Sequence, residues 1–318
     1  MIILCYVEGY DAQIDELYKG FFEKYIPGVD FRAWPNWGDP ASFDEATDVY
    51  AYVWAPPQGL LAKYSMINAI FSIGAGIDHL TADPLLPKNV PIIRMGDESL
   101  KDGMGEYATM AALWFLRDMK NVSAWQKRGE WQHHFPKAPS QFTIGLMGYG
   151  LLGKAVAKRL KPFGFKLATW STSEKDPEEG ITHYRGSTCL KDFMANVDMI
   201  YALLPQTTET TDLINKTSLR WMKKGSYIVN AGRGNLIDLP TLVDAVKNGH
   251  IAGAMLDVFK EEPLPKGDPA WLTEGIIITP HVAAITRPDT STKFVAETII
   301  KLTKGEKIET MLDIRRGY

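Results

Sequence analysis

Three charged side chains of this sequence could together reduce a carbonyl group, and each of them follows an apolar run. They are Arg233 after residues 226–230, Glu262 after residues 253–257, and His281 after residues 276–279. In an open parallel sheet, ligands bind beyond the carboxyl ends of the strands. If the three runs are strands of one such sheet, their arginine, carboxylate and imidazole emerge at the same edge.

Each of the three side chains has its own role in such a reaction. Hydride transfer from a nicotinamide to a carbonyl needs a proton donor that cycles near neutral pH, and His281 has that chemistry. Glu262, hydrogen-bonded to the far nitrogen of this ring, would fix its tautomer and keep its proton available. Arg233 can hold a substrate carboxylate through two hydrogen bonds and polarise the carbonyl oxygen. The set predicts an acid with an adjacent keto group as the substrate.

The other candidates for catalysis or metal binding are weaker. Any one of the three predicted catalytic residues could instead be a loop anchor, a surface carboxylate or a packed imidazole. We assign such structural roles to the remaining histidines, which are His79, His133, His134, His183 and His250. The sequence has no HExxH motif, no i, i+4 histidine pair and no thiolate cluster. We therefore expect no metal.

A glycine-rich turn in the middle of the chain predicts a dinucleotide site. Residues 143–147 form an apolar run that leads into Gly148-Tyr149-Gly150-Leu151-Leu152-Gly153, and apolar residues at helical spacing follow. The first glycine permits the tight turn, the second lets the backbone approach a pyrophosphate, and the third allows close helix packing. The alternative is a structural turn that binds no nucleotide. The strand, turn and helix in this order favour the dinucleotide.

The residues after the next strand distinguish NAD(H) from NADP(H). An acidic residue there would bind the ribose diol and repel a 2′-phosphate. Here residues 166–170 are followed by three hydroxyl side chains and, soon after, by a cation; these residues are Ser171, Thr172, Ser173 and Lys175. This group suits a phosphate, whereas Glu174 and the lack of an arginine argue against one. We predict NADP(H) in preference to NAD(H).

The elements that must position these residues form an alternating α/β pattern. In the second half of the chain we predict strands near residues 143–147, 166–170, 199–204, 226–230, 253–257 and 276–279, with helices between them. Such alternation is typical of a doubly wound parallel sheet. In the first hundred residues we predict strands at residues 2–7, 49–54, 69–73 and 91–94. The fold class is therefore α/β, with a flavodoxin-like domain and a Rossmann domain.

Two helices indicate where the domains divide. Apolar residues from Met104 to Val122 keep a helical period, which predicts one helix of at least about 30 Å that starts at a crossing between domains. A last helix, entered at residues 287–289 and ending at Gly305, has no strand left to cross to in the second domain. We expect it to return to the first domain. The substrate domain then comprises residues 1–100 and 285–318, and the dinucleotide-binding domain comprises residues 101–284.

Composition and charge exclude several other functions. The 318 residues are 45% hydrophobic and 23% charged, and no apolar run approaches the roughly 18 residues of a membrane helix. A formal charge of −3 is too balanced for nucleic-acid binding. The two cysteines, Cys5 and Cys189, and an N-terminus unlike a signal peptide favour the cytoplasm.

Over nearly its whole length the sequence resembles the D-isomer-specific 2-hydroxyacid dehydrogenase family. The family's Arg, Glu and His set corresponds to Arg233, Glu262 and His281. Thr207 is a further match, and the resemblance implies NAD(P) binding through other residues, which are Leu204, Pro205, Thr210, Asn230, Ala231, Gly232, Asp257 and Ala283. Among them, Asp257 is implied to contact the nicotinamide carboxamide.

Within the family, the sequence is most similar to the glyoxylate/hydroxypyruvate reductase A group. This likeness rests on residues 53–57, on residues 74–78 and on Glu106-Tyr107. It implies that the backbone of Gly74, Ala75, Gly76 and Ile77 holds the substrate carboxylate. Trp54 would line the pocket and limit its size, although a core aromatic is an equal alternative. The basic residue that this group usually has near Thr172 is absent.

The resemblance also implies a homodimer whose interface is formed largely by the long helix, with Trp131 reaching into the partner's active site. The predicted function is NADPH-dependent reduction of small 2-oxo acids, glyoxylate and hydroxypyruvate first. One alternative is a dehydrogenase of another D-2-hydroxy acid or a related substrate with NAD, which a larger pocket in place of Trp54 would favour. The other is a dinucleotide-sensing, corepressor-like binding protein, for whose extra segments the chain has no room.

Overall fold

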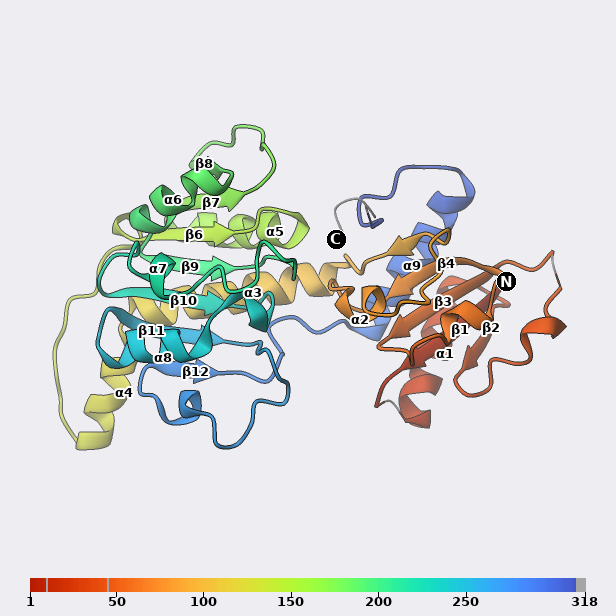
Figure 1. Cartoon of the computed structure of the whole chain (residues 1–318), viewed down its shortest axis with the longest axis horizontal. Helices are drawn as coiled ribbons and strands as arrows, with labels where there is room; N and C mark the ends of the chain where they lie inside the picture. The colour runs from red at the N-terminus through yellow and green to blue at the C-terminus, as the bar shows by residue number, and fades with distance from the viewer. Residues whose placement is uncertain (10, 45, 313–318) are drawn as a thin grey trace. The chain divides into compact units, whose positions relative to one another are not determined.

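A computed structural model describes residues 1–9, 11–44 and 46–312, and in it the chain divides into two units (Figure 1). The first unit takes the chain up to Leu100 and again from Ile285, and the second takes Lys101–Ala284. Each unit has one sheet of parallel strands with helices packed on it. The predicted fold class, two α/β domains with parallel sheets, is confirmed.

The sheet of the first unit has five strands in the order β2-β1-β3-β4-β5. Its strands are β1 (Ile2–Val7), β2 (Asp30–Ala33), β3 (Val49–Trp54), β4 (Ile67–Ser72) and β5 (Ile92–Ile93). The helices of this unit are α1 (Ala12–Tyr25), α2 (Asp78–Thr81) and α9 (Pro288–Thr303). Helix α9 packs against α1 and belongs to the first unit. Strand β2 was not predicted.

The sheet of the second unit has seven strands in the order β12-β11-β10-β9-β6-β7-β8. Its strands are β6 (Thr143–Met147), β7 (Lys166–Ser171), β8 (Ile181–Arg185), β9 (Met199–Ala202), β10 (Ser226–Asn230), β11 (Ile251–Leu256) and β12 (Ile276–Ile278). The strand order reverses between β6 and β9, which is the switch point at which doubly wound sheets bind dinucleotides. The half-exposed edge strand β8 was not predicted.

Helices cover both faces of this second sheet. On one face, α5 (Leu151–Leu160) and the long α3 (Glu98–Leu116), which begins in the first unit, bury side chains such as Ala111 and Val156. On the other face, α6 (Leu190–Asn196), α7 (Lys216–Leu219) and α8 (Leu239–Lys247) bury side chains such as Phe193 and Leu242. These apolar layers hold the strands in place, so that the loops at their carboxyl ends have a rigid support.

The single helix predicted over residues 104–122 is wrong, because the chain breaks between α3 and α4 (Met119–Arg128). Asp118, which precedes α4, has a left-handed backbone with φ 52° and ψ 41°. Its carboxylate accepts a hydrogen bond from Asn121 Nδ2 at 2.8 Å. Aspartate adopts this conformation more easily than most residues. The apolar spacing continues across the break, and for this reason it gave no sign of the interruption.

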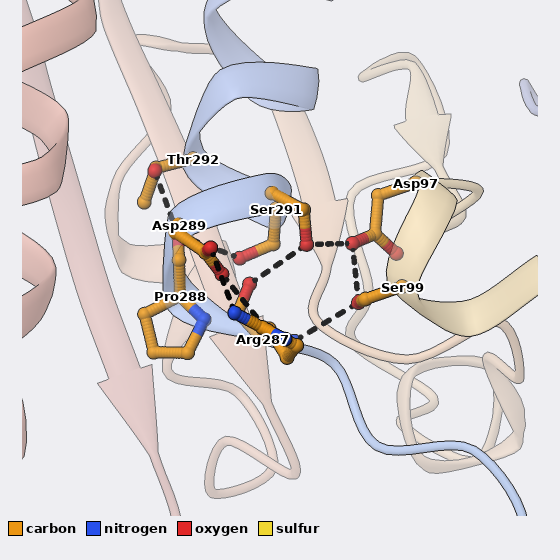
Figure 2. A network of polar contacts seen from close by, with 8 residues as sticks. Asp97, Ser99, Arg287, Pro288, Asp289, Ser291 and Thr292 are labelled. Carbon is orange, nitrogen blue, oxygen red and sulfur yellow. Dashed lines mark hydrogen bonds and ion pairs between the residues drawn. The ribbon is translucent and has the colours of Figure 1, made fainter. Parts of the chain in front are cut away.

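A polar network inside the first unit joins the start of α3 to the start of α9 (Figure 2). The buried carboxylate of Asp97 accepts hydrogen bonds from the hydroxyls of Ser99, at 2.6 Å, and Thr290. Ser99 Oγ in turn accepts a hydrogen bond from the backbone N–H of Arg287 at 3.2 Å. The two segments at which the chain leaves and re-enters this unit are therefore fastened to each other.

Candidate active site

Strands β10, β11 and β12 are neighbours in the sheet and run parallel, so their carboxyl ends lie at the same edge. Arg233, Glu262 and His281 lie in the three loops that leave this edge. His281 Nδ1 is 2.7 Å from Glu262 Oε2, which brings two of the three predicted residues into direct contact. Arg233 lies in the loop after β10, where its Nη1 donates to the carbonyl of Gly232 at 2.8 Å.

The loops after β10 and β11 touch backbone to backbone, and this contact orients Glu262. A Cβ at Gly234 would lie 1.8 Å from the carbonyl carbon of Phe259, a distance that only glycine avoids. The backbone N–H of Phe259 donates to Glu262 Oε1 at 2.8 Å, which leaves Oε2 for His281. Both carboxylate oxygens of Glu262 are thus engaged, and its orientation relative to the imidazole is fixed.

Asp257, at the end of β11, shapes the turn that contains His281. Its buried carboxylate accepts hydrogen bonds from the Thr279 hydroxyl at 2.6 Å and from the backbone N–H groups of Val282 and Ala283 at 2.8 and 2.9 Å. Its backbone carbonyl accepts a bond from the N–H of His281 at 2.9 Å. These four bonds hold His281 in a left-handed conformation with φ 55°. With 46% of its side chain exposed, the imidazole is accessible to a ligand.

The hydrogen-bond network of this turn extends into α3. The hydroxyl of Tyr107 lies 2.7 Å from Thr279 Oγ1, which itself bonds to Asp257. Burial raises the pKa of Tyr107 above its ordinary value, and the nearby charge of Asp257 acts in the same direction. The phenol therefore stays neutral and can donate a hydrogen bond to the Thr279 hydroxyl, which itself donates to Asp257. In the sequence, Tyr107 supports only the family resemblance, and no spacing there connects it with His281.

The glycine-rich turn between β6 and α5 has the shape that a pyrophosphate requires. Gly148 has φ +108°, and a Cβ at Gly153 would lie 2.3 Å from the carbonyl oxygen of Gly148, so neither position tolerates another residue. Gly150 is the N-cap of α5 and has open space around it, so no side chain caps the first N–H groups of the helix. These free donors at a helix N-terminus suit a phosphate anion. The turn thus fits a dinucleotide.

Tyr149 fastens the glycine-rich turn to the loop that follows β7. Its buried hydroxyl donates to Glu178 Oε2 at 2.5 Å, and Lys161 Nζ donates to the other oxygen of this carboxylate at 2.6 Å. The bond from Lys161, followed by the bond from Tyr149, lowers the pKa of Glu178 below its ordinary value. Burial raises the pKa of Tyr149. The carboxylate and the phenol accordingly keep the protonation states on which this contact depends.

The loop after β7 contains an ion pair that the sequence did not suggest. Ser171, the last residue of β7, is paired in register with Arg185, the last residue of β8. Arg185 Nη1 donates to Glu174 Oε2 at 2.9 Å, while the Ser171 hydroxyl donates to the carbonyl of Ser173 at 2.7 Å. An arginine of the adjacent strand is therefore paired with the acidic residue of this turn. The run of β-branched and aromatic residues after Gly180 was the available signal for that strand.

The loops after β9 and β10 lie against each other. Strand β9 is next to β6 on the side away from β7. In the loop after β9, Thr210 Oγ1 donates to the carbonyl of Pro205 at 2.7 Å. In the loop after β10, the Asn230 side chain accepts from the N–H of Gly232 at 3.1 Å. A Cβ at Gly232 would lie 3.0 Å from the carbonyl oxygen of Leu204. The residues between 204 and 232 that were predicted to bind the cofactor thus form a closely packed pair of loops.

In the first unit, the structure brings Trp54 and the turn at residues 74–77 together. Trp54 ends β3, and a Cβ at Gly74 would lie 2.4 Å from its ring. The ring centroids of Trp54 and His79 are 4.3 Å apart. The hydroxyl of Ser72 donates to the carbonyl of Gly76 at 3.0 Å, which holds the turn after β4 in shape. Trp54 is only partly buried, so part of its surface is available to a ligand.

Further observations concern membrane spans, metal sites and exposed aromatic side chains. Among the residues that the structure describes, no helix has both the length and the apolar character needed to cross a membrane. In the same part of the chain, no three His, Cys, Asp or Glu side chains gather as a metal site would require. Trp131 and Phe135, which follow α4, are 89% and 99% exposed.

Comparison with known proteins agrees with this geometry. Residues 109–283 match the family model of the D-isomer specific 2-hydroxyacid dehydrogenase NAD binding domain. Glyoxylate/hydroxypyruvate reductase A of Klebsiella pneumoniae is 36% identical over 325 residues, which span 100% of each chain. The protein of the same name from Citrobacter koseri is 36% identical over 93% of this chain and 94% of its own length.

Solved structures show the same relationship. A D-isomer specific 2-hydroxyacid dehydrogenase from Xanthobacter autotrophicus, in complex with NADPH and MES, superposes with a TM-score of 0.91 at 33% identity, over 99% of both chains. An NADPH-dependent glyoxylate/hydroxypyruvate reductase from Sinorhizobium meliloti, in complex with NADP and sulfate, gives a TM-score of 0.88 at 29% identity, over 100% of this chain and 99% of its own. The chain therefore belongs to the D-isomer-specific 2-hydroxyacid dehydrogenase family.

Proposed function

We propose that this protein reduces small 2-oxo acids with NADPH, converting glyoxylate to glycolate and hydroxypyruvate to glycerate. The observation that supports this most directly is the 2.7 Å contact between His281 and Glu262, in loops that leave the same sheet edge as Arg233. An acid, its orienting carboxylate and a carboxylate-binding cation are the groups that this reaction needs. Full-length relatives named for this activity support the choice of substrates.

In this mechanism, NADPH supplies the hydride that adds to the carbonyl carbon. Arg233 binds the carboxylate of the 2-oxo acid and polarises the adjacent carbonyl oxygen. In the imidazolium form of His281, Nδ1–H donates a hydrogen bond to Glu262, so the proton on Nε2 faces the substrate. His281 gives this proton to the oxygen as negative charge develops there, and solvent later restores it. The hydroxy acid leaves with one hydride and one proton gained.

We assign substrate recognition in the first unit to Trp54 and to the turn at residues 74–77. The close approach of the Trp54 ring to Gly74 supports this, because only glycine lets the indole lie directly against the turn. In this assignment the turn binds the substrate carboxylate, and the indole limits the size of the acid.

We assign the cofactor to NADP(H). The dehydrogenase from Xanthobacter autotrophicus was solved with NADPH and the reductase from Sinorhizobium meliloti with NADP, which supports the same cofactor here. The hydroxyl side chains of Thr172 and Ser173 and the uncapped N-terminus of α5 provide donors for its phosphates, whereas the Ser171 hydroxyl already donates to the carbonyl of Ser173. We further propose the cytoplasm as its location, since Cys5 and Cys189 are both free thiols.

A spectrophotometric assay of NADPH oxidation tests the proposal directly. We expect the highest kcat/KM with glyoxylate and hydroxypyruvate, lower values with bulkier 2-oxo acids, and lower values with NADH than with NADPH. A bulkier acid or NADH as the better substrate would show another dehydrogenase of the family. Binding of NADPH without turnover of any 2-oxo acid would instead indicate a dinucleotide-sensing protein and overturn the proposal.

A further inference from the structure

Arg185 lies at the carboxyl end of the sheet of the second unit, beside the turn that follows β7. It is the last residue of the edge strand β8, and its register partner is Ser171, the last residue of β7. The two strand ends are fastened by hydrogen bonds from Gly186 N to the Ser171 carbonyl, at 3.0 Å, and from Trp170 Nε1 to the Gly186 carbonyl, at 2.9 Å. The backbone of Arg185 is therefore held beside the hydroxyl-rich turn after β7, within reach of its guanidinium.

Glu174 and Arg185 neutralise each other in this turn. Their side chains are 80% and 62% exposed, and the atoms Oε2 and Nη1 are 2.9 Å apart. An ion pair so exposed to water is weak, so a stronger anion can replace the carboxylate. A phosphate monoester has up to two negative charges at neutral pH and accepts two parallel hydrogen bonds from a guanidinium. The Arg185 guanidinium is therefore an anion-binding group. In this structure the Glu174 carboxylate occupies it, and a phosphate can replace that carboxylate.

We propose that Arg185 binds the 2′-phosphate of NADPH and determines the preference for NADPH over NADH. Glu174 holds the guanidinium beside residues 171–173 until the cofactor arrives, and the phosphate then displaces it. An acidic residue in this turn would otherwise favour the ribose diol of NADH. Here the acidic residue is Glu174, and its carboxylate is paired with Arg185 from the next strand. This inference rests on the proposed function, because it assigns the cofactor specificity of that same reaction.

Calorimetry with two cofactor fragments separates the phosphate contact from the rest of the site. The fragments are 2′,5′-ADP, which has the 2′-phosphate, and 5′-ADP, which lacks it. We expect Arg185→Ala to weaken binding of 2′,5′-ADP by about tenfold or more, with less than about a twofold change for 5′-ADP. Arg185→Lys should recover part of the loss. Glu174→Gln should strengthen 2′,5′-ADP binding several-fold, because it removes the competing charge.

Arg220→Ala is the matched control, since Arg220 is an exposed arginine of the same unit between α7 and β10. This variant loses the same charge as Arg185→Ala and should leave the affinities for 2′,5′-ADP and 5′-ADP unchanged. Equal weakening of both fragments by Arg185→Ala, or no weakening of either, overturns the inference. So does a wild-type protein that binds the two fragments equally. Should Arg185→Ala fail to fold, Arg185→Lys and Glu174→Gln still measure the effect.

Failure of this inference and failure of the proposed function give different results. Fragment binding requires no 2-oxo acid, so a loss of 2′,5′-ADP affinity in Arg185→Ala would support the inference even in a protein without reductase activity. Conversely, an active Arg185→Ala enzyme that keeps the wild-type ratio of kcat/KM for NADPH over NADH would overturn it. The reduction of glyoxylate would then still stand.

Discussion

At the scale of single residues, the proposed chemistry depends on how completely the partners of His281 are fixed. Glu262 offers His281 only one oxygen, because the other accepts the backbone N–H of Phe259. The ring is therefore hydrogen-bonded through Nδ1, while Nε2 is left for the substrate. An imidazole oriented in this way needs little rearrangement before it transfers a proton.

Replacement of His281 should abolish most turnover and leave cofactor binding intact. We expect His281→Ala to lower kcat on the order of 10²-fold or more, because the developing oxyanion loses its proton donor. The Kd for NADPH, measured by fluorescence titration, should change little. His250→Ala is the control, since His250 precedes β11 at the amino end of the strand and bonds to the Leu219 carbonyl. Full turnover in His281→Ala would remove this residue as the acid.

Loss of Arg233 should act on the substrate. The Arg233 guanidinium has five N–H donors, and its Nη1 donates to the Gly232 carbonyl at 2.8 Å. We expect Arg233→Ala to lower kcat/KM for glyoxylate by about 10²-fold or more, because the carboxylate loses its charged partner. Steady-state kinetics with glyoxylate and with an uncharged aldehyde measure the effect, and only the acid should be affected strongly. An unchanged kcat/KM for glyoxylate would contradict the carboxylate contact.

At the scale of elements, the site is a set of loops that leave one sheet edge and touch each other. Those after β10 and β11 meet at Gly234 and Phe259, and the turn after β12 is held by Asp257 from the end of β11. No loop is positioned by its own strand alone. Parallel strands therefore supply the common edge, while contacts between successive loops set the distances.

A side chain at Gly234 should separate two of these loops. A Cβ there would lie 1.8 Å from the carbonyl carbon of Phe259, and backbone atoms cannot rotate away as a flexible side chain can. We expect Gly234→Ala to destabilise the protein by about 1–3 kcal/mol and to lower kcat at least about tenfold, because Glu262 moves with Phe259. Thermal unfolding and kinetics measure both effects.

Gly267→Ala is the control for this change. Gly267 lies in the same unit, and an added Cβ there meets nothing within 4 Å. We expect it to leave both the unfolding temperature and kcat close to those of the wild type. Wild-type kcat in Gly234→Ala would show that the contact between the loops does not position Glu262.

The sequence predicts those elements whose signal is local. The interior strands β6 and β10 lie at the residues predicted from their apolar runs, and His281 and Glu262 were singled out because they follow such runs. The edge strands β2 and β8 were missed because they are short and half-exposed, so their residues alternate weakly. The contact between Arg185 and Glu174 depends on the pairing of β8 with β7, and no residue spacing indicates such a pairing.

At the scale of the whole molecule, we extend the proposed function to a homodimer. Trp131 and Phe135 are large aromatic side chains on the segment after α4, and both are almost fully exposed. Exposed aromatic clusters are typical of surfaces that bind another protein. In this proposal the segment docks on a second copy of the chain, as the family resemblance implies for Trp131.

Charges on this segment should therefore dissociate the dimer. We expect wild-type protein to sediment as a dimer and the double variant Trp131→Glu, Phe135→Glu to sediment as a monomer, because burying two carboxylates in an apolar interface costs several kcal/mol. Leu272→Glu is the control, as Leu272 is an equally exposed apolar residue of the same unit outside the segment, and this variant should stay dimeric. Sedimentation velocity over a range of concentrations measures the state of each. A dimeric double variant, or a monomeric wild type, would show that the segment has another purpose.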